Sequence, residues 1–104
     1  MSAVARAKKP VGTKQFLRVR CETKSGGREC RVMDMNQEGA FIESFVPPVT
    51  GSKVSLRFRL PGGETIRTNA IVKYHQFRVG FGLEFTDLSS SDRGLISNFL
   101  DSRY

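Results

Sequence analysis

Hydrophobic and polar residues alternate along much of the chain with a period of two, which marks half-buried β-strands. The alternation is strict in residues 53–60, where the apolar set is Val54, Leu56, Phe58 and Leu60. Residues 79–85 alternate in the same way, and Gly80 and Gly82 fall on the face opposite the apolar side chains. Glycines inside a strand mark a place where another group can approach the backbone closely.

Apolar runs between turn-forming residues predict further strands over residues 16–23, 29–35, 40–45 and 65–74. Near the end of the chain the apolar residues change to a helical spacing, at Leu95, Ile96, Phe99 and Leu100. Ser89 and Asp92 precede this stripe and resemble a capping box with Asp in place of Glu. We therefore predict a mainly β protein, a small antiparallel barrel of six or seven strands. A short C-terminal amphipathic helix is expected to pack across the sheet or to cover an open barrel end.

Residues 1–13 show no such period and contain Pro10 and Gly12. We expect a flexible basic tail there, followed by a single barrel domain over residues 14–104, because 104 residues fit one domain. With 38% hydrophobic and 26% charged residues, the composition excludes a wholly disordered chain. No apolar run reaches the ~18–20 residues of a membrane helix, and the basic N-terminus is not followed by the apolar stretch of a signal peptide. We therefore expect a cytoplasmic protein that does not insert into membranes.

The formal net charge of +7 is concentrated in the first third of the chain. Residues 1–31 hold nine Lys or Arg against Glu22 and Glu29, whereas residues 32–104 hold eight basic and eight acidic residues. A localised positive field attracts phosphate-bearing partners such as nucleic acid, nucleotides or anionic lipid. A solvated tail that only aids solubility is the alternative.

Residues that could carry metal or catalytic chemistry are few. Cys21 and Cys30 are too few for a disulfide framework, and with His75 as the single histidine they do not make a zinc site. A hairpin turning at Ser25 and Gly26 could place the two cysteines opposite each other, but we expect free thiols in a reducing cytosol. No motif pairs a nucleophile with a base, and we expect His75 to lie on the surface in a hairpin connection. The sequence therefore indicates a protein that is not an enzyme.

Two short motifs stand out near the first predicted strands. Lys14 and Arg18 lie four residues apart where the tail meets the first strand, and Arg20 shares a strand face with Arg18. The strand over residues 29–35 leads into a D-x-N-x-x-G run formed by Asp34, Asn36 and Gly39. By itself this run is typical of a turn, because Asn and Gly tolerate positive φ and Asp can bond its own backbone.

In their order along the chain, these segments resemble the PilZ domain, a bacterial six-stranded barrel that binds cyclic di-GMP. The resemblance covers about residues 13–101. It includes PPVTGSKVSLRF and GFGLEF, which are similar to the family's Pro-x-Gly-x-x-Val-x-Leu and Gly-x-Gly-Val-x-Phe segments. Lys14 and Arg18 occupy the family's RxxxR motif, and its (D/N)xSxxG motif is occupied by Asp34, Asn36 and Gly39. Lys14 stands where Arg is usual, and Asn36 stands where Ser is usual.

The resemblance implies a cyclic di-GMP site, with no metal and no other cofactor, made by Lys14, Arg18, Arg20, Asp34, Asn36 and Gly39. Arg18 can bond guanine O6 and N7 with both arms of its fork or stack on the base. Lys14 keeps a charge for phosphate but lacks the fork. Asp34 can accept from guanine N1–H and N2–H₂, and Asn36 offers an amide donor to phosphate. Gly39 allows a close backbone approach or a positive φ.

The sequence leaves three possible functions. The first is a stand-alone cyclic di-GMP receptor that reshapes its N-terminal tail on binding. With no second domain, its output would be contact with an unidentified effector protein that controls motility, adhesion or exopolysaccharide production. The second is a PilZ-like adaptor whose site has degenerated at Lys14 and Asn36 and no longer binds the nucleotide. The third is a barrel that binds nucleic acid through its basic tail, which the core-facing periods of most aromatic residues disfavour.

Overall fold

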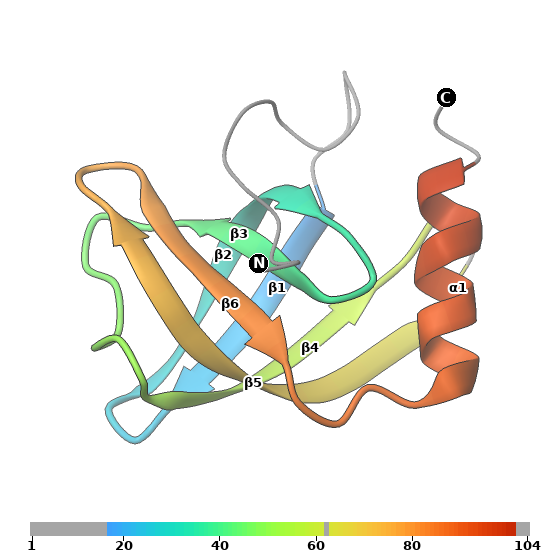
Figure 1. Ribbon diagram of the computed structural model, residues 1–104, viewed down its shortest axis with the longest axis horizontal. Helices are drawn as coiled ribbons and strands as arrows, with labels where there is room; N and C mark the ends of the chain where they lie inside the picture. Colours follow the sequence, from blue (N-terminus) through green and yellow to red (C-terminus); the bar gives the residue numbers. More distant parts are fainter. Residues whose placement is uncertain (1–16, 62, 102–104) are drawn as a thin grey trace.

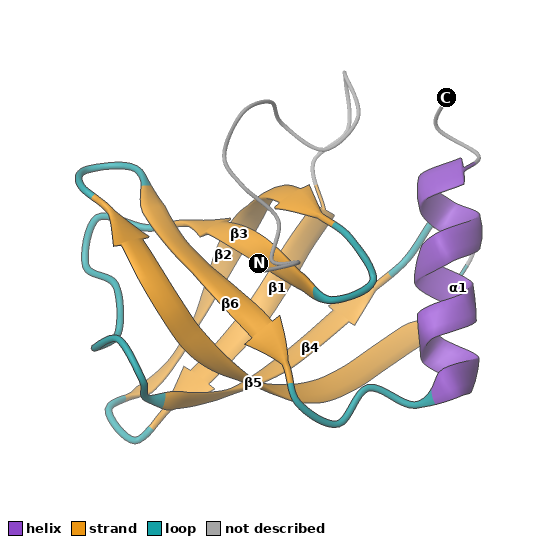
Figure 2. Ribbon diagram, in the orientation of Figure 1, coloured by secondary structure: helices purple, strands orange, loops and turns teal. Residues whose placement is uncertain are grey.

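The computed structural model describes residues 17–61 and 63–101, which form six β-strands and one α-helix (Figures 1 and 2). The elements are β1 (Leu17–Thr23), β2 (Gly26–Met35), β3 (Gly39–Glu43), β4 (Lys53–Arg59), β5 (Thr65–Gln76), β6 (Gly80–Phe85) and α1 (Ser90–Asp101). All neighbouring strands are antiparallel, and they close into a barrel in the order β1-β2-β3-β6-β5-β4. The predicted antiparallel barrel with a C-terminal helix is confirmed. The predicted tail over residues 1–13 lies outside the described residues.

The core of the protein is the inside of the barrel. Along β4 the buried and exposed residues alternate without a break, so Val54, Leu56 and Phe58 point inward and the polar residues of the strand, Arg57 among them, point outward. The other strands add side chains such as Val19, Val32, Ile42, Ile66, Val72, Phe81 and Leu83 to the same cluster. Burial of these side chains drives the barrel to close, since removing apolar area from water is the main favourable term in folding.

Strand β6 departs from this alternation because it is buried on both faces. The ring of Tyr74 covers Gly82, and a methyl group at that position would overlap the ring. Phe41 of β3, fully buried, lies on the same outer side, with its ring centroid 5.9 Å from that of Tyr74. The close approach expected at Gly80 and Gly82 is therefore confirmed, and at Gly82 the approaching group is an aromatic side chain of the neighbouring strand.

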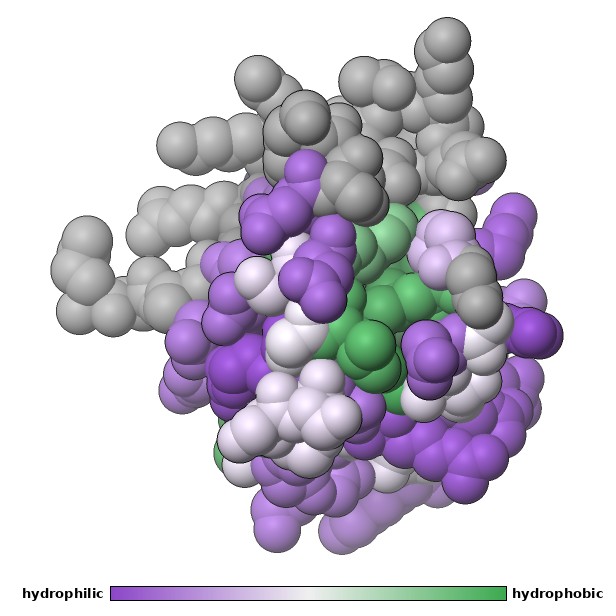
Figure 3. All heavy atoms as spheres, turned by 90° about the vertical axis from the view of Figure 1, so that its right-hand side faces the viewer, coloured by the Kyte–Doolittle hydropathy of each residue, from purple (hydrophilic) through white to green (hydrophobic). Residues whose placement is uncertain are grey.

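Helix α1 begins after Ser89, whose Oγ accepts a hydrogen bond from the Asp92 N–H at 3.0 Å. Ile96 is fully buried in the core, and Leu95, Phe99 and Leu100 pack partly buried against it. The helix stands at one end of the barrel, as expected (Figure 1). Figure 3 looks onto this end and shows apolar residues gathered in the middle of a polar rim. No helix in the part of the chain that the structure describes is long and apolar enough to cross a membrane.

Two predicted connections were wrong. Strand β5 continues to Gln76, so His75 lies within a strand and not in a hairpin connection, although it is exposed as expected. Its Nε2 atom lies 2.6 Å from the carbonyl oxygen of Pro48. The first hairpin is tighter than expected, because β2 begins at Gly26, which has a φ of 124°.

Candidate functional site

Arg18 of the first motif lies at the same end of the barrel as the second motif. Strand β1 begins where β2 ends, because Leu17 lies opposite Val32 and Arg18 lies opposite Arg31. Asp34 follows two residues after Val32, past a shift in the register between β2 and β3. Antiparallel pairing therefore brings Arg18 and the Asp34–Gly39 run to the same rim of the barrel, whereas Lys14 lies outside the described residues.

Asn36 shapes the connection between β2 and β3. Its side-chain Oδ1 accepts hydrogen bonds from the backbone N–H groups of Glu38 (2.8 Å) and Gly39 (3.0 Å). Its own N–H donates to the Gly39 carbonyl at 3.0 Å. The Oδ1 atom therefore fixes the turn, as Asn side chains often do. A contact from Asn36 to an anion has to come from its other amide atom, the Nδ2 donor.

Asp34 is held in place by its own backbone. The carboxylate is half-buried, and its Oδ1 accepts a hydrogen bond from the Met35 N–H at 2.9 Å. This bond restricts the rotation of the carboxylate at the barrel rim. An oriented carboxylate with two acceptor oxygens is the group that can bind two adjacent N–H donors at once.

Gly39 is required by strand packing. A methyl group at this position would overlap the carbonyl oxygen of Leu83 on β6. Among the described glycines a positive φ occurs at Gly26, Gly51 and Gly63, so a left-handed backbone is not what Gly39 provides. Of the two roles expected for Gly39, the structure shows the close approach, and the group that approaches is a neighbouring strand.

Arg18 and Arg20 both point away from the core on β1. Arg18 is exposed at the rim, whereas Arg20 lies two residues further along the strand, opposite Glu29 on β2 and Arg57 on β4. Arg20 also forms an exposed ion pair with Glu22, with 3.4 Å between Nε and Oε2. The structure thus places Arg18 at the same rim as the Asp34–Gly39 run, and Arg20 on the same outer face as Arg18 but further from the rim.

Arg93 of α1 reaches the same turn and was missed by the sequence analysis. Its Nη1 atom donates to the Gln37 carbonyl at 2.6 Å and lies 3.7 Å from Oε2 of Glu38. The Glu38 carbonyl in turn accepts from the Phe85 N–H at 2.8 Å. The helix is therefore tied to the turn that carries the motif. No local sequence signal links residues so far apart in the chain.

The two cysteines lie side by side but not directly opposite. Cys21 is paired with Arg28 and Cys30 with Val19, so the register makes them diagonal neighbours, and the arrangement considered from the sequence was wrong. Both are buried free thiols. The Cys21 thiol donates a hydrogen bond to Cys30, which lowers the pKa of Cys30 to about 7 and raises that of Cys21. Among the described residues, no group of three or more His, Cys, Asp or Glu side chains could hold a metal ion.

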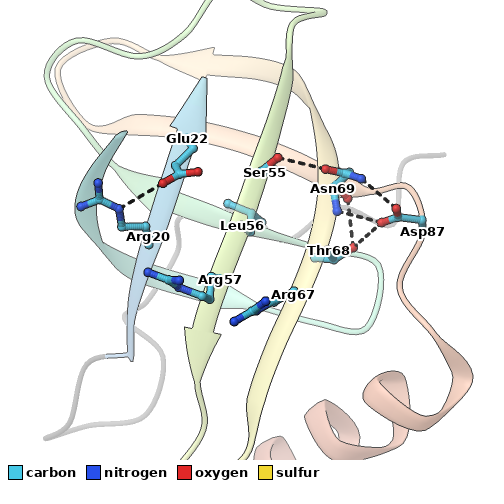
Figure 4. A pocket seen from close by; sticks show the side chains of 9 residues that line it. All are labelled: Arg20, Glu22, Ser55, Leu56, Arg57, Arg67, Thr68, Asn69 and Asp87. Atoms are coloured by element: carbon cyan, nitrogen blue, oxygen red, sulfur yellow. Dashed lines mark hydrogen bonds and ion pairs between the residues drawn. The ribbon is translucent and has the colours of Figure 1, made fainter. Parts of the chain in front are cut away.

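Asp87, in the loop between β6 and α1, makes contacts to β5 that the sequence did not predict (Figure 4). Its carboxylate accepts from the Asn69 N–H (2.7 Å), the Asn69 Nδ2 (2.8 Å) and the Thr68 hydroxyl (2.9 Å). These bonds hold the pKa of Asp87 below its ordinary value, because they favour the charged carboxylate. Asp87 therefore fastens the loop before α1 to β5.

Comparison with known proteins gives one family and two similar solved structures. The Bacillus subtilis inhibitor of motility (MotI/DgrA) matches with a TM-score of 0.74 at 16% identity, over 95% of this chain and 52% of that one. The Borreliella burgdorferi PlzA protein, solved in complex with c-di-GMP, matches with a TM-score of 0.63 at 14% identity, over 80% of this chain and 32% of that one. The chain thus spans about half of the first protein and a third of the second, and the likeness is one of fold. No curated protein matches the sequence. The model of the PilZ domain matches residues 6–102, nearly the whole sequence, and the chain therefore belongs to the PilZ domain family.

Proposed function

We propose that this PilZ domain is a receptor for cyclic di-GMP that passes the signal to a protein partner. The observation that carries the proposal is that Arg18 and the Asp34–Gly39 run lie at the same rim of the barrel. Family membership supports it, since PilZ domains are receptor and adaptor modules and not enzymes. The c-di-GMP bound to PlzA, a protein of the same fold, supports the choice of ligand.

Each candidate ligand residue has a separate part in this proposal. Arg18 binds one guanine through its fork or by stacking, and Asp34 accepts the guanine N1–H and N2–H₂ groups. Lys14 neutralises a phosphate as a point charge, and Asn36 donates its Nδ2–H. Arg20 adds positive charge from the same outer face of β1 as Arg18, and Gly39 keeps the turn close to β6.

The output follows from where Lys14 and Arg18 sit in the sequence. The ligand bridges the N-terminal segment that carries Lys14 to the barrel rim, and so changes the surface that a partner meets. The proposed partner acts in the control of motility, adhesion or exopolysaccharide production, and of these outputs the name of MotI, an inhibitor of motility, supports the first.

A second candidate function is an adaptor that uses the same fold without the nucleotide. The observation in its favour is that Asn36, which replaces the usual Ser, uses its Oδ1 to close the turn. Lys14 in place of Arg is the second departure from the family's motifs. Both departures are expected of a site whose residues keep a structural role but no longer bind the nucleotide.

Calorimetric titration with cyclic di-GMP separates the two functions. Wild type is compared with Arg18→Ala and with Arg67→Ala, a matched control that removes an exposed strand arginine outside both motifs. A receptor binds the nucleotide saturably, loses binding in Arg18→Ala and keeps it in Arg67→Ala. Absence of saturable binding by folded wild-type protein contradicts the receptor and leaves the adaptor.

A further inference from the structure

Five arginines point outward from three neighbouring strands and make what we call the arginine face: Arg18 and Arg20 of β1, Arg57 and Arg59 of β4, and Arg67 of β5. Three of them form one row across the sheet, because Arg20 lies directly opposite Arg57 and Arg57 lies directly opposite Arg67. Figure 4 shows the side chains of this row on adjacent strands. Only the register of the closed barrel brings them together.

The arginine face has little internal neutralisation. Arg20 is paired with Glu22, but within the described chain no carboxylate lies within 4.0 Å of the guanidinium groups of the other four. Like charges directly opposite on paired strands are destabilising. The row of arginines therefore lowers the stability of the unbound protein. An anionic partner that binds there relieves the repulsion.

The surface over this row is hollowed and polar. A hollow of about 420 Å³ is lined by Arg20, Arg57 and Arg67, and a second one of about 780 Å³ shares these residues and extends to Arg18 and Arg59. Asn69 borders the first hollow and is fixed from two sides, by the Asp87 carboxylate and by the Ser55 hydroxyl at 3.1 Å. Hydrogen-bonding groups of fixed position thus stand beside the row of charges.

The composition of the face indicates which anion it fits. Guanidinium forks match carboxylates and phosphates equally well, so charge alone does not choose between protein and nucleic acid. The large exposed hydrophobic side chains of the described chain are Phe45, Val46, Val49 and Phe77, none of which lines either hollow. Phe58 borders the second hollow but is buried in the core, so bases find no exposed ring to stack on among the described residues. Glu22 and Glu29 line the hollows and oppose a continuous phosphate chain. They suit a protein surface of mixed charge with an excess of carboxylates.

We propose that the arginine face is the docking surface for the protein partner, and that the partner presents a row of Asp or Glu side chains to it. The inference deepens the proposed function and rests on it for the partner's role in signalling. Arg18 and Arg20 are shared with the proposed nucleotide site, whereas Arg57, Arg59 and Arg67 belong to neither ligand motif, so the docking surface is tested at Arg57 and Arg67.

The test uses fluorescence anisotropy with a labelled peptide of about a dozen residues that alternates Glu and Ser, at low and at physiological salt. A peptide with Lys in place of Glu and a single-stranded oligothymidylate of similar length serve as the other probes. The face variant is Arg57→Gln/Arg67→Gln. Its matched control is Lys24→Gln/Arg78→Gln, which removes the same charge from two exposed turns that line neither hollow.

Wild type and the control variant should bind the Glu peptide more tightly than either other probe. The face variant should bind it roughly five- to tenfold more weakly, as expected for the loss of two exposed charges. The face variant should also melt at or above the wild-type temperature, because the repulsion within the row is reduced. Equal affinities for the two variants overturn the proposal, and so does tighter binding of the oligothymidylate, which would make the face a nucleic-acid surface.

Calorimetry with cyclic di-GMP on the same samples keeps the two proposals apart. The face variant should retain wild-type affinity for the nucleotide. One possible result is that wild type does not bind cyclic di-GMP and the face variant loses peptide binding. This result contradicts the receptor function but supports the docking surface. Nucleotide binding with no specific peptide binding contradicts the docking surface alone.

Discussion

Gly39 shows that one residue of a ligand motif can also be fixed by packing. We expect Gly39→Ala to lower the free energy of unfolding by about 1–3 kcal/mol or more, the usual cost of overpacking, because the new methyl group meets the Leu83 carbonyl. Urea unfolding followed by circular dichroism measures this change. Gly94→Ala is the control: it lies in α1 with nothing within 4 Å of the added group, and should raise the free energy of unfolding by roughly 0.5–1 kcal/mol. Equal stability of Gly39→Ala and wild type would contradict the packing role.

Lys14 stands where the family's RxxxR motif has Arg, and of the two departures it bears most directly on the affinity for cyclic di-GMP. A lost bidentate guanine contact is worth about 1–3 kcal/mol, so we expect Lys14→Arg to tighten cyclic di-GMP binding roughly five- to 150-fold. Lys8→Arg makes the same chemical change outside the motif and should leave the affinity unchanged. Calorimetry on both variants measures the effect, and an unchanged affinity in Lys14→Arg would assign no guanine contact to this position.

Cys30 has unusual acidity for a buried thiol. Since the Cys21 thiol donates a hydrogen bond to it and Arg28 lies nearby, the pKa of Cys30 is lowered to about 7. We expect the rate of alkylation by iodoacetamide to rise with pH through this value, because the thiolate is the nucleophile. In Cys21→Ala the donor is lost and the rise should move to higher pH. A pH profile that is the same in wild type and Cys21→Ala would exclude this hydrogen bond as the cause.

At the scale of elements, the loop between β6 and α1 fixes the helix against the barrel. Asp87 holds it at β5 through three hydrogen bonds, Ser89 caps the helix, and Arg93 reaches the β2–β3 turn. The helix is thus joined to the barrel both before its first residue, through Asp87, and after its first turn, through Arg93. The two contacts reach parts of the barrel that are far apart in the sequence.

The Asp87 bonds predict how the protein responds to acid. The pKa of Asp87 is lowered in the folded state, so its contribution to stability is present above the ordinary value and is lost as the pH falls through the folded value. We expect Asp87→Asn to melt at a lower temperature than wild type at neutral pH, with the difference shrinking as the pH falls below about 4. Thermal unfolding followed at several pH values measures this. Asp101→Asn, an exposed position at the end of α1, should behave as wild type, and a difference independent of pH would contradict the assignment.

At the scale of the whole molecule, ligand binding and folding are linked. A ligand that binds only the folded barrel stabilises it by about 2.7 kcal/mol at a free concentration near one hundred times its dissociation constant. For a domain of this size that corresponds to a rise in the melting temperature of roughly 4–8 °C per kcal/mol. At that concentration we expect cyclic di-GMP to raise the melting temperature of wild type by roughly 11–22 °C and that of Arg18→Ala by far less. A melting temperature that does not respond to the nucleotide would speak for the adaptor function.

The sequence alone determined the kinds of elements and pointed to the candidate ligand residues. Strict alternation in residues 53–60 predicts β4, and the apolar spacing around Ile96 predicts α1, because side-chain direction repeats with period 2 or 3.6 within an element. The Asp34–Gly39 run is contiguous, so it too is visible in the sequence.

Only the tertiary structure decided which distant residues meet. Three features depend on strand order and register. They are the hydrogen bond of Arg93 to the β2–β3 turn, the bonds of Asp87 to β5, and the row of Arg20, Arg57 and Arg67. Register is set by barrel closure and by shifts such as the one between Val32 and Asp34, which no local pattern encodes. A one-residue slip in any pair would turn these side chains to the other face. For that reason the elements could be predicted from the sequence, whereas the surfaces that they form together could not.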